Sequence, residues 1–199
     1  MSPKENLMSK IGDLLFFRKH HVCPRWLCFT FDNRIRRLLQ DPDRIMNSFI
    51  RPGDTVVDVG PGIGFFTIAM ARLVGDGGRV IAVDIQEKML KAILERAQRA
   101  GVSNRIRTVL AGENSLNVTV LADFILAFWM AHEVPDQERF FAGLHAILKE
   151  GGRFLLAEPK LHVTKTQFDM SVNLAQKSGF DLLERPAISL SHAALFLKH

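Results

Sequence analysis

Residues 56–66 read Val-Val-Asp-Val-Gly-Pro-Gly-Ile-Gly-Phe-Phe, and this stretch decides the fold. An apolar, β-branched run ends in Gly60, Gly62 and Gly64, and a helical pattern then continues to its stop at Gly75. A strand followed by a glycine-rich turn and a helix opens a parallel α/β sheet, and the glycines let a ligand approach the backbone. Dinucleotide enzymes use a turn of the same kind, so the neighbouring residues must discriminate between ligands.

Two details of this turn favour a ligand other than a dinucleotide. The spacing is G-x-G-x-G, with Phe65 where the dinucleotide fingerprint G-x-G-x-x-G has its third glycine. Asp58 lies two residues before Gly60, where a carboxylate would attract an ammonium group and repel a pyrophosphate. An NAD-type oxidoreductase is therefore disfavoured, and titration with the nicotinamide cofactor would test this.

The next two predicted strands supply polar groups for the rest of such a ligand. Asp84 ends the second strand, 24 residues after Gly60, where a carboxylate can accept hydrogen bonds from both hydroxyls of a ribose. Ile85 beside it would pack on an adenine face, and Glu113 after the third strand is placed to accept the adenine amino hydrogen. An ammonium-bearing amino acid, a ribose and an adenine are the parts of S-adenosylmethionine.

The remaining chain alternates short apolar runs with helical patterns, which predicts βαβ units and a mostly parallel sheet. A helix-like segment is predicted over residues 33–50, and helices over residues 65–74, between 84 and 101, from Pro135 to Gly151-Gly152 and over about 165–178. Thr164 and Gln167 form a capping box at the start of the last of these. Parallel strands are predicted over residues 55–59, 79–83, 106–110, 122–128 and 153–157. Two last strands, near 181–186 and 191–197, are too close in sequence for a parallel crossover, so we expect an antiparallel pair at one sheet edge.

On these residues the chain resembles the class I SAM-dependent methyltransferases, over about residues 50–199. Residues 58–64, DVGPGIG, match the first motif of that family, and Asp84 matches its ribose-binding acid. The resemblance implies a Rossmann-like, seven-stranded, mostly parallel sheet of order 3-2-1-4-5-7-6, with one antiparallel edge strand and helices on both faces. Within the family, the chain is most similar to the small-molecule branch that includes ubiquinone/menaquinone and arsenite methyltransferases.

The resemblance also implies which residues contact S-adenosylmethionine. Asp58, Gly60, Gly62 and Gly64 would contact its methionine end. Asp84 would bind its ribose. Ile85 and Glu113 would contact its adenine. Glu113 departs from the family pattern, which more often has aspartate at this position.

Missing motifs narrow the class of methyl acceptor. Residues 127–130 read Ala-Phe-Trp-Met in place of the [DN]-P-P-[YF] motif of enzymes that methylate exocyclic amines, and the loop has no Pro-Cys nucleophile. Both cysteines precede residue 30, whereas arsenite methyltransferases need further cysteines after the core begins. We therefore expect a small-molecule acceptor, anionic or partly apolar, and no nucleic-acid partner.

Two histidines are candidate catalytic bases. His132 follows the fourth predicted strand and His162 follows the fifth, and ligands of open α/β sheets bind beyond these strand ends. Either imidazole can take a proton from the acceptor, although a loop or capping role would explain each histidine equally well. The methyl carbon is already activated by the sulfonium, so alignment and desolvation alone can suffice. A non-catalytic SAM-binding protein, acting as a sensor or partner subunit, is the alternative.

The composition is that of one globular domain. The 199 residues are 47% hydrophobic and 24% charged, which allows a sizeable core without disulfides. The longest apolar stretch, residues 118–131, is too short to cross a bilayer, and residues 1–17 lack a signal-peptide core. These features predict a cytoplasmic protein without a transmembrane segment, and a homodimer is compatible with them. No metal site is predicted, because no zinc signature fits the cluster of His20, His21, Cys23 and Cys28.

The amino-terminal segment differs from the rest of the chain. Its first 45 residues hold nine Lys and Arg against five Asp and Glu, and residues 11–31 are dense in aromatic side chains that need burial. We predict that residues 1–50 form a helical and aromatic cover over a methyltransferase domain of residues 51–199, with residues 11–31 closing the acceptor pocket. A membrane-surface or partner-binding arm would use the same mixture of side chains.

Overall fold

The structure, a computed structural model, describes residues 39–112 and 115–199. Several of the residues singled out above lie outside this described part. They are the predicted closing segment of residues 11–31, the cluster of His20, His21, Cys23 and Cys28, and Glu113. Most of the predicted cover of residues 1–50 lies outside it as well.

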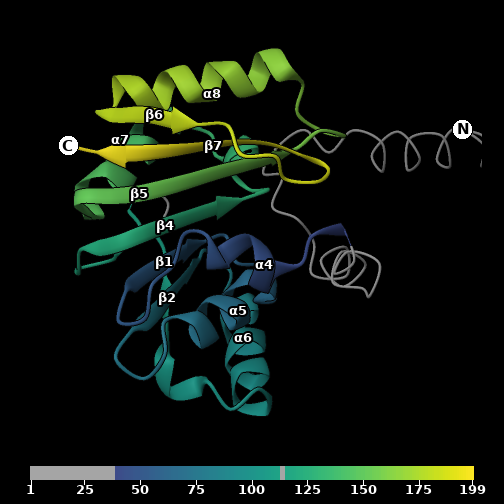
Figure 1. The fold of residues 1–199 in the computed structure, drawn as a ribbon, viewed down its shortest axis with the longest axis vertical. Helices are drawn as coiled ribbons and strands as arrows, with labels where there is room; N and C mark the ends of the chain where they lie inside the picture. The colour runs from purple at the N-terminus through teal and green to yellow at the C-terminus, as the bar shows by residue number, and fades with distance from the viewer. Residues whose placement is uncertain (1–38, 113–114) are drawn as a thin grey trace, which may run out of the picture.

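Seven strands form one sheet of order β3-β2-β1-β4-β5-β7-β6, as Figure 1 shows. Strands β1 to β5 are parallel, whereas β7 is antiparallel to both β5 and β6. The seven-stranded sheet, its order and its antiparallel pair at one edge are confirmed. The strands are β1 (Thr55–Val59), β2 (Arg79–Asp84), β3 (Ile106–Leu110), β4 (Ala122–Phe128), β5 (Leu148–Pro159), β6 (Phe180–Glu184) and β7 (Ser191–Lys198).

Helices cover both faces of the sheet, so its central strands are apolar on both sides. Val56 of β1 packs in the core cluster under α4, α5 and α6, while Val57 packs in the cluster under α7 and α8. Phe49, just after α4, stacks on Phe124 of β4 with ring centroids 5.8 Å apart. The helices are α4 (Pro42–Asn47), α5 (Phe65–Leu73), α6 (Glu87–Arg99), α7 (Gln137–Ile147) and α8 (Lys165–Lys177). None of these helices combines the length and the apolar composition needed to cross a membrane.

Two helices begin where an aspartate caps them rather than where the apolar pattern starts. In the described part of the predicted helical segment 33–50, α4 starts at Pro42, and the Asp41 carboxylate accepts from two backbone N–H groups. Helix α7 starts two residues after Pro135, because Asp136 accepts a hydrogen bond from Arg139 N at 3.0 Å. The predicted start of this helix at Pro135 is therefore wrong by two residues.

The end of α7 and the start of β5 also differ from the prediction. The helix ends at Ile147, before Gly151-Gly152, because Leu148 already has an extended backbone with φ −94° and ψ 139°. Leu148 pairs with Ala122 of β4 and is fully buried, so strand pairing and burial outweigh the helical pattern there. Strand β5 consequently begins five residues before the predicted span 153–157.

Helix α8 starts as predicted, with a capping box. Thr164 Oγ1 accepts from Gln167 N at 3.3 Å, and Gln167 Oε1 accepts from Thr164 N at 2.9 Å.

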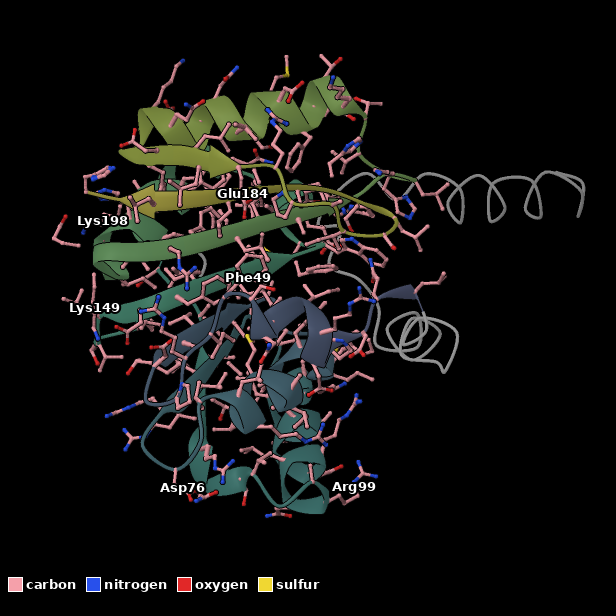
Figure 2. All side chains as sticks on the ribbon, viewed as in Figure 1. Phe49, Asp76, Arg99, Lys149, Glu184 and Lys198 are labelled. Atoms are coloured by element: carbon pink, nitrogen blue, oxygen red, sulfur yellow. The ribbon has the colours of Figure 1, made fainter. Side chains whose placement is uncertain are left out.

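Parallel strands β1 to β5 all end at one edge of the sheet, and their amino ends lie at the opposite edge. Lys149 and Lys198 mark that opposite edge in Figure 2. The predicted site residues therefore gather where the parallel strands end.

Candidate cofactor and acceptor site

The glycine turn after β1 has the backbone that only glycine adopts readily. Gly60, Gly62 and Gly64 have φ values of 65°, 56° and 86°, all in the left-handed region. A Cβ on Gly60 would lie 2.8 Å from Cβ of Met130, so glycine lets the end of β4 approach the turn. A Cβ on Gly62 would meet nothing within 4 Å. The turn thus leaves open space over Gly62, as a ligand cradle requires.

Asp58 is a buried acid beside this turn. Its side chain is 2% exposed and accepts a hydrogen bond from Thr67 Oγ1 of α5 at 2.6 Å. Burial and, to a smaller extent, the nearby charge of Asp84 raise the pKa of Asp58 to about 7, against the lowering effect of the Thr67 hydrogen bond. No cation pairs with this carboxylate among residues 39–112 and 115–199, and a positively charged ligand group would supply that counter-charge.

Asp84 ends β2, the neighbour of β1. Burial raises its pKa to about 6, although backbone N–H groups of Gln86 and Ile85 hydrogen-bond to it and lower the pKa. The Gln86 N–H donates to Asp84 Oδ1 at 2.8 Å. The adjacent Ile85 side chain is 55% exposed, so its apolar surface is accessible to a ligand. A carboxylate with an exposed apolar neighbour suits a ribose and an aromatic base.

These described residues fit S-adenosylmethionine. Two poorly solvated carboxylates match its ammonium group and its ribose hydroxyls. The open space at Gly62 leaves room for a ligand to lie against the protein backbone. Ile85 offers the apolar surface for adenine. The predicted adenine contact of Glu113 lies outside the described residues.

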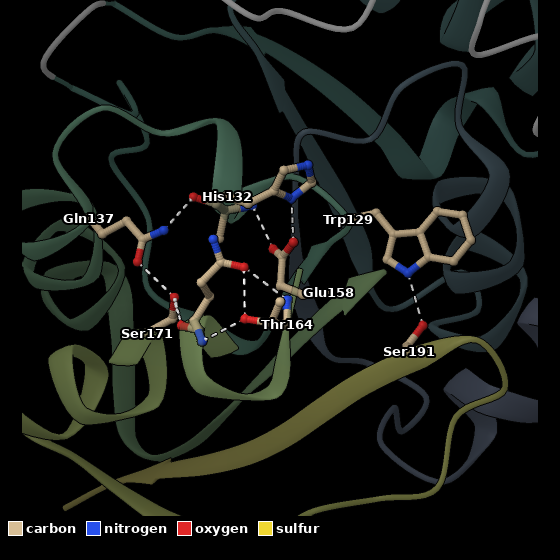
Figure 3. Close-up of polar contacts among 9 residues, drawn as sticks. Trp129, His132, Gln137, Glu158, Thr164, Ser171 and Ser191 are labelled. Carbon is tan, nitrogen blue, oxygen red and sulfur yellow. Dashed lines mark hydrogen bonds and ion pairs between the residues drawn. The ribbon is translucent and has the colours of Figure 1, made fainter. Parts of the chain in front are cut away.

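His132 and Glu158 form a pair at the ends of β4 and β5, as Figure 3 shows. His132 Nδ1 bonds to Glu158 Oε2, and Glu158 Oε1 accepts from Ala131 N at 2.8 Å. The Glu158 side chain is 1% exposed, whereas that of His132 is 30% exposed. Burial lowers the pKa of His132, but the hydrogen bond and charge of Glu158, with the charge of Glu133, raise it more. The net pKa of His132 is above its ordinary value.

The pair has the arrangement of an oriented proton acceptor. A carboxylate on Nδ1 fixes the neutral imidazole with its proton on that nitrogen, which leaves Nε2 as the acceptor. His162, by contrast, lies exposed in the turn between β5 and α8, and its imidazole bonds to no other residue of the described chain. The structure brings His132, and not His162, into an organised polar site.

Three residues of the site carry roles that the sequence did not indicate. Thr67 donates to Asp58, Glu158 holds His132, and Trp129 donates from Nε1 to Ser191 Oγ at 2.8 Å. Thr67 could have been found as a hydroxyl in the first turn of the helix that follows the glycine turn. Trp129 has a φ of 60°, and nothing in the sequence indicates a left-handed backbone at a tryptophan.

Comparison with known proteins is consistent with this geometry. Residues 50–184 match a family described as "Methyltransferase domain". The chain is 32% identical over 149 residues to the ubiquinone/menaquinone biosynthesis C-methyltransferase UbiE of Enterobacter sp. (strain 638), covering 74% of this chain and 53% of that protein. The UbiE of Klebsiella pneumoniae (strain 342) is 31% identical over the same shares. The chain thus spans about half the length of the curated relatives it matches.

Among solved structures, a SAM dependent methyltransferase from Aquifex aeolicus has a similar fold. Its TM-score is 0.78 at 20% identity, and the match covers 89% of this chain and 100% of that one. Sheet order, glycine turn and buried strand-end acids define a Rossmann-like protein of the kind that holds S-adenosylmethionine. The chain belongs to the methyltransferase-domain family. S-adenosylmethionine is the cofactor that the family and the fold imply.

Proposed function

We propose that this protein transfers a methyl group from S-adenosylmethionine to a small-molecule acceptor. The observation that carries the proposal is the pair of poorly solvated acids, Asp58 and Asp84, beside the open space at Gly62. Such acids destabilise the folded chain when they ionise, which is the arrangement expected where a bound cation and hydroxyl donors complete the site. A role in folding alone would not require either acid.

Different residues of this chain bind the cofactor and the acceptor. Asp58 holds the ammonium group and Asp84 holds the ribose hydroxyls. When bound, S-adenosylmethionine supplies a methyl carbon already activated by its sulfonium. His132 takes the proton of the acceptor on Nε2, while Glu158 stabilises the imidazolium that forms. Trp129, next to β4, forms a wall of the acceptor side.

The acceptor class follows from the base and from the relatives. An oriented histidine is useful for an acceptor atom that must lose a proton, such as a hydroxyl, an amine or an acidic carbon. The relatives are named C-methyltransferases of ubiquinone and menaquinone biosynthesis. Their name supports a carbon of a small molecule as the acceptor atom.

A metabolite search tests the activity. Wild-type protein incubated with S-adenosylmethionine and a small-molecule extract should raise the mass of at least one compound by one methylene unit. Asp84→Ala should lose cofactor affinity, whereas His132→Ala should keep it and lose turnover. Calorimetry with S-adenosylmethionine and mass spectrometry of the extract separate the two effects.

The alternative function is a sensor or partner subunit that binds S-adenosylmethionine without transferring its methyl group. Tight cofactor binding with no methylated product in any extract would favour this alternative. We also propose that residues 1–50 cover a methyltransferase domain of residues 51–199, and that the protein is cytoplasmic and forms a homodimer.

A further inference from the structure

A basic pocket of about 410 Å³ opens where β5 ends, between the loop from β6 to β7 and the first turn of α8. Among the described residues, the charged side chains that line it are Lys160, Lys165 and Arg185, and none of the described residues that line it carries a carboxylate. Phe168 and His192 stack on one another at its aromatic side, with ring centroids 5.6 Å apart. The pocket therefore combines positive charge with the partly exposed His192 ring, which packs on the buried Phe168 ring.

The positive charge of this pocket is only partly neutralised. Arg185 pairs with Asp169 at 2.8 Å, and its guanidinium carbon lies 5.7 Å from the centre of the Phe168 ring. Lys160 and Lys165 have no carboxylate within ion-pair distance in residues 39–112 and 115–199. Lys165 is also the first residue of α8, where the helix dipole adds partial positive charge.

The pocket adjoins the His132–Glu158 pair and not the glycine turn. His192 lies directly opposite Glu158 in the β5–β7 ladder, so both side chains project from the same face of the sheet. Ser191, which also lines the pocket, accepts the Trp129 hydrogen bond. Asp58, Gly60, Gly62, Gly64, Asp84 and Ile85, the described residues assigned to the cofactor, do not line the pocket. Its place is on the acceptor side of the strand ends.

We propose that this pocket binds an oxyanion, a carboxylate or a phosphate, carried by the methyl acceptor. The inference rests on the proposed function, and it names the acceptor as an anionic small molecule. Lys160 and Lys165 supply the charge, and the first turn of α8 supplies backbone N–H donors. Its volume lies within the range of small-molecule sites, which leaves room for part of the acceptor skeleton beside His192.

Inorganic phosphate is the probe for this pocket in the full chain. The double variant Lys160→Gln/Lys165→Gln should weaken phosphate binding at least fivefold. The control Lys91→Gln/Lys177→Gln removes the same charge from exposed positions of α6 and α8 and should leave phosphate affinity unchanged. Asp169→Asn releases Arg185 from its partner and should strengthen phosphate binding. Affinity for S-adenosylmethionine should stay the same in all three variants.

The outcomes separate this proposal from the proposed function. Absence of phosphate binding by the wild type, equal losses in both double variants, or a parallel loss of cofactor affinity would each overturn the anion pocket. Binding to phosphatidylglycerol vesicles that only Lys160→Gln/Lys165→Gln abolishes would assign the pocket to a membrane surface and would also overturn it. A wild type that binds phosphate at this pocket but makes no methylated product would instead contradict the proposed function.

Discussion

At the scale of single residues, Gly62 combines a left-handed backbone with open space above it. Its φ is 56°, and a Cβ there would meet no atom within 4 Å. Gly75, at the end of α5, has the same two properties with a φ of 64° and is remote from the predicted cofactor contacts. The two glycines therefore form a matched pair in which strain is equal and only the proposed ligand differs.

We expect Gly62→Ala to abolish measurable S-adenosylmethionine binding and Gly75→Ala to leave it intact. Each substitution should cost about 1–2 kcal/mol of stability, because an L side chain is strained in this region. Calorimetry gives the affinities and urea unfolding gives the stabilities. Equal cofactor affinity in the two variants would contradict the cradle at Gly62.

Glu158 acts at the same scale, through His132. Its charge and hydrogen bond raise the pKa of His132, so the base becomes neutral only at a higher pH than an ordinary histidine. We expect Glu158→Gln to move the acidic limb of the kcat profile to lower pH and to reduce the plateau by about 10²-fold. S-adenosylmethionine affinity is the control and should not change. An unmoved acidic limb would show that Glu158 has only a structural role.

At the scale of elements, α8 presents Lys165 and Phe168 to the basic pocket, and the capping box fixes where the helix begins. Thr164→Ala removes the side-chain acceptor for Gln167 N and should cost about 1 kcal/mol. Thr166→Ala, an exposed position in the same first turn, is the matched control and should be nearly neutral. Urea unfolding of both variants tests this, and equal destabilisation would argue against the cap.

At the scale of the whole molecule, the two buried acids make stability depend on pH. The pKa values of Asp58 and Asp84 rise from 3.8 to about 7 and about 6 in the folded chain, so the unfolded chain loses these protons first. The free energy of unfolding therefore falls as the pH rises from about 4 to 7, because the unfolded state binds fewer protons than the folded state in this range. Asp58→Asn should reduce this dependence of the unfolding free energy on pH. The dependence that is left in the variant should come from Asp84 and should end at about pH 6.

Chemical unfolding at pH 4.5, 5.5, 6.5 and 7.5 measures the slope for both proteins. Saturating S-adenosylmethionine should also reduce the slope in the wild type, because the ligand favours the ionised acids. Identical slopes for wild type and Asp58→Asn would show that burial of Asp58 does not penalise its charge.

The sequence alone determined those features that depend on neighbours along the chain. The run from Val56 to Phe66 predicted a strand, a glycine-rich turn and a helix, and Thr164 with Gln167 predicted the start of α8. The alternation of strands and helices predicted the parallel sheet. The order of its strands came from the family resemblance, because sequence periodicity does not show which strands are neighbours.

Only the tertiary structure decided which distant residues meet. His132 and Glu158 are 26 residues apart and pair because β4 lies beside β5. The basic pocket brings Lys160 and Lys165 together with Arg185 and His192 because β7 pairs with β5. The early start of β5 has the same origin, since pairing and burial of Leu148 overrode the helical pattern. Local sequence patterns indicate the secondary structure that each segment prefers. The energies of strand pairing and burial depend on which residues the folded chain places opposite that segment.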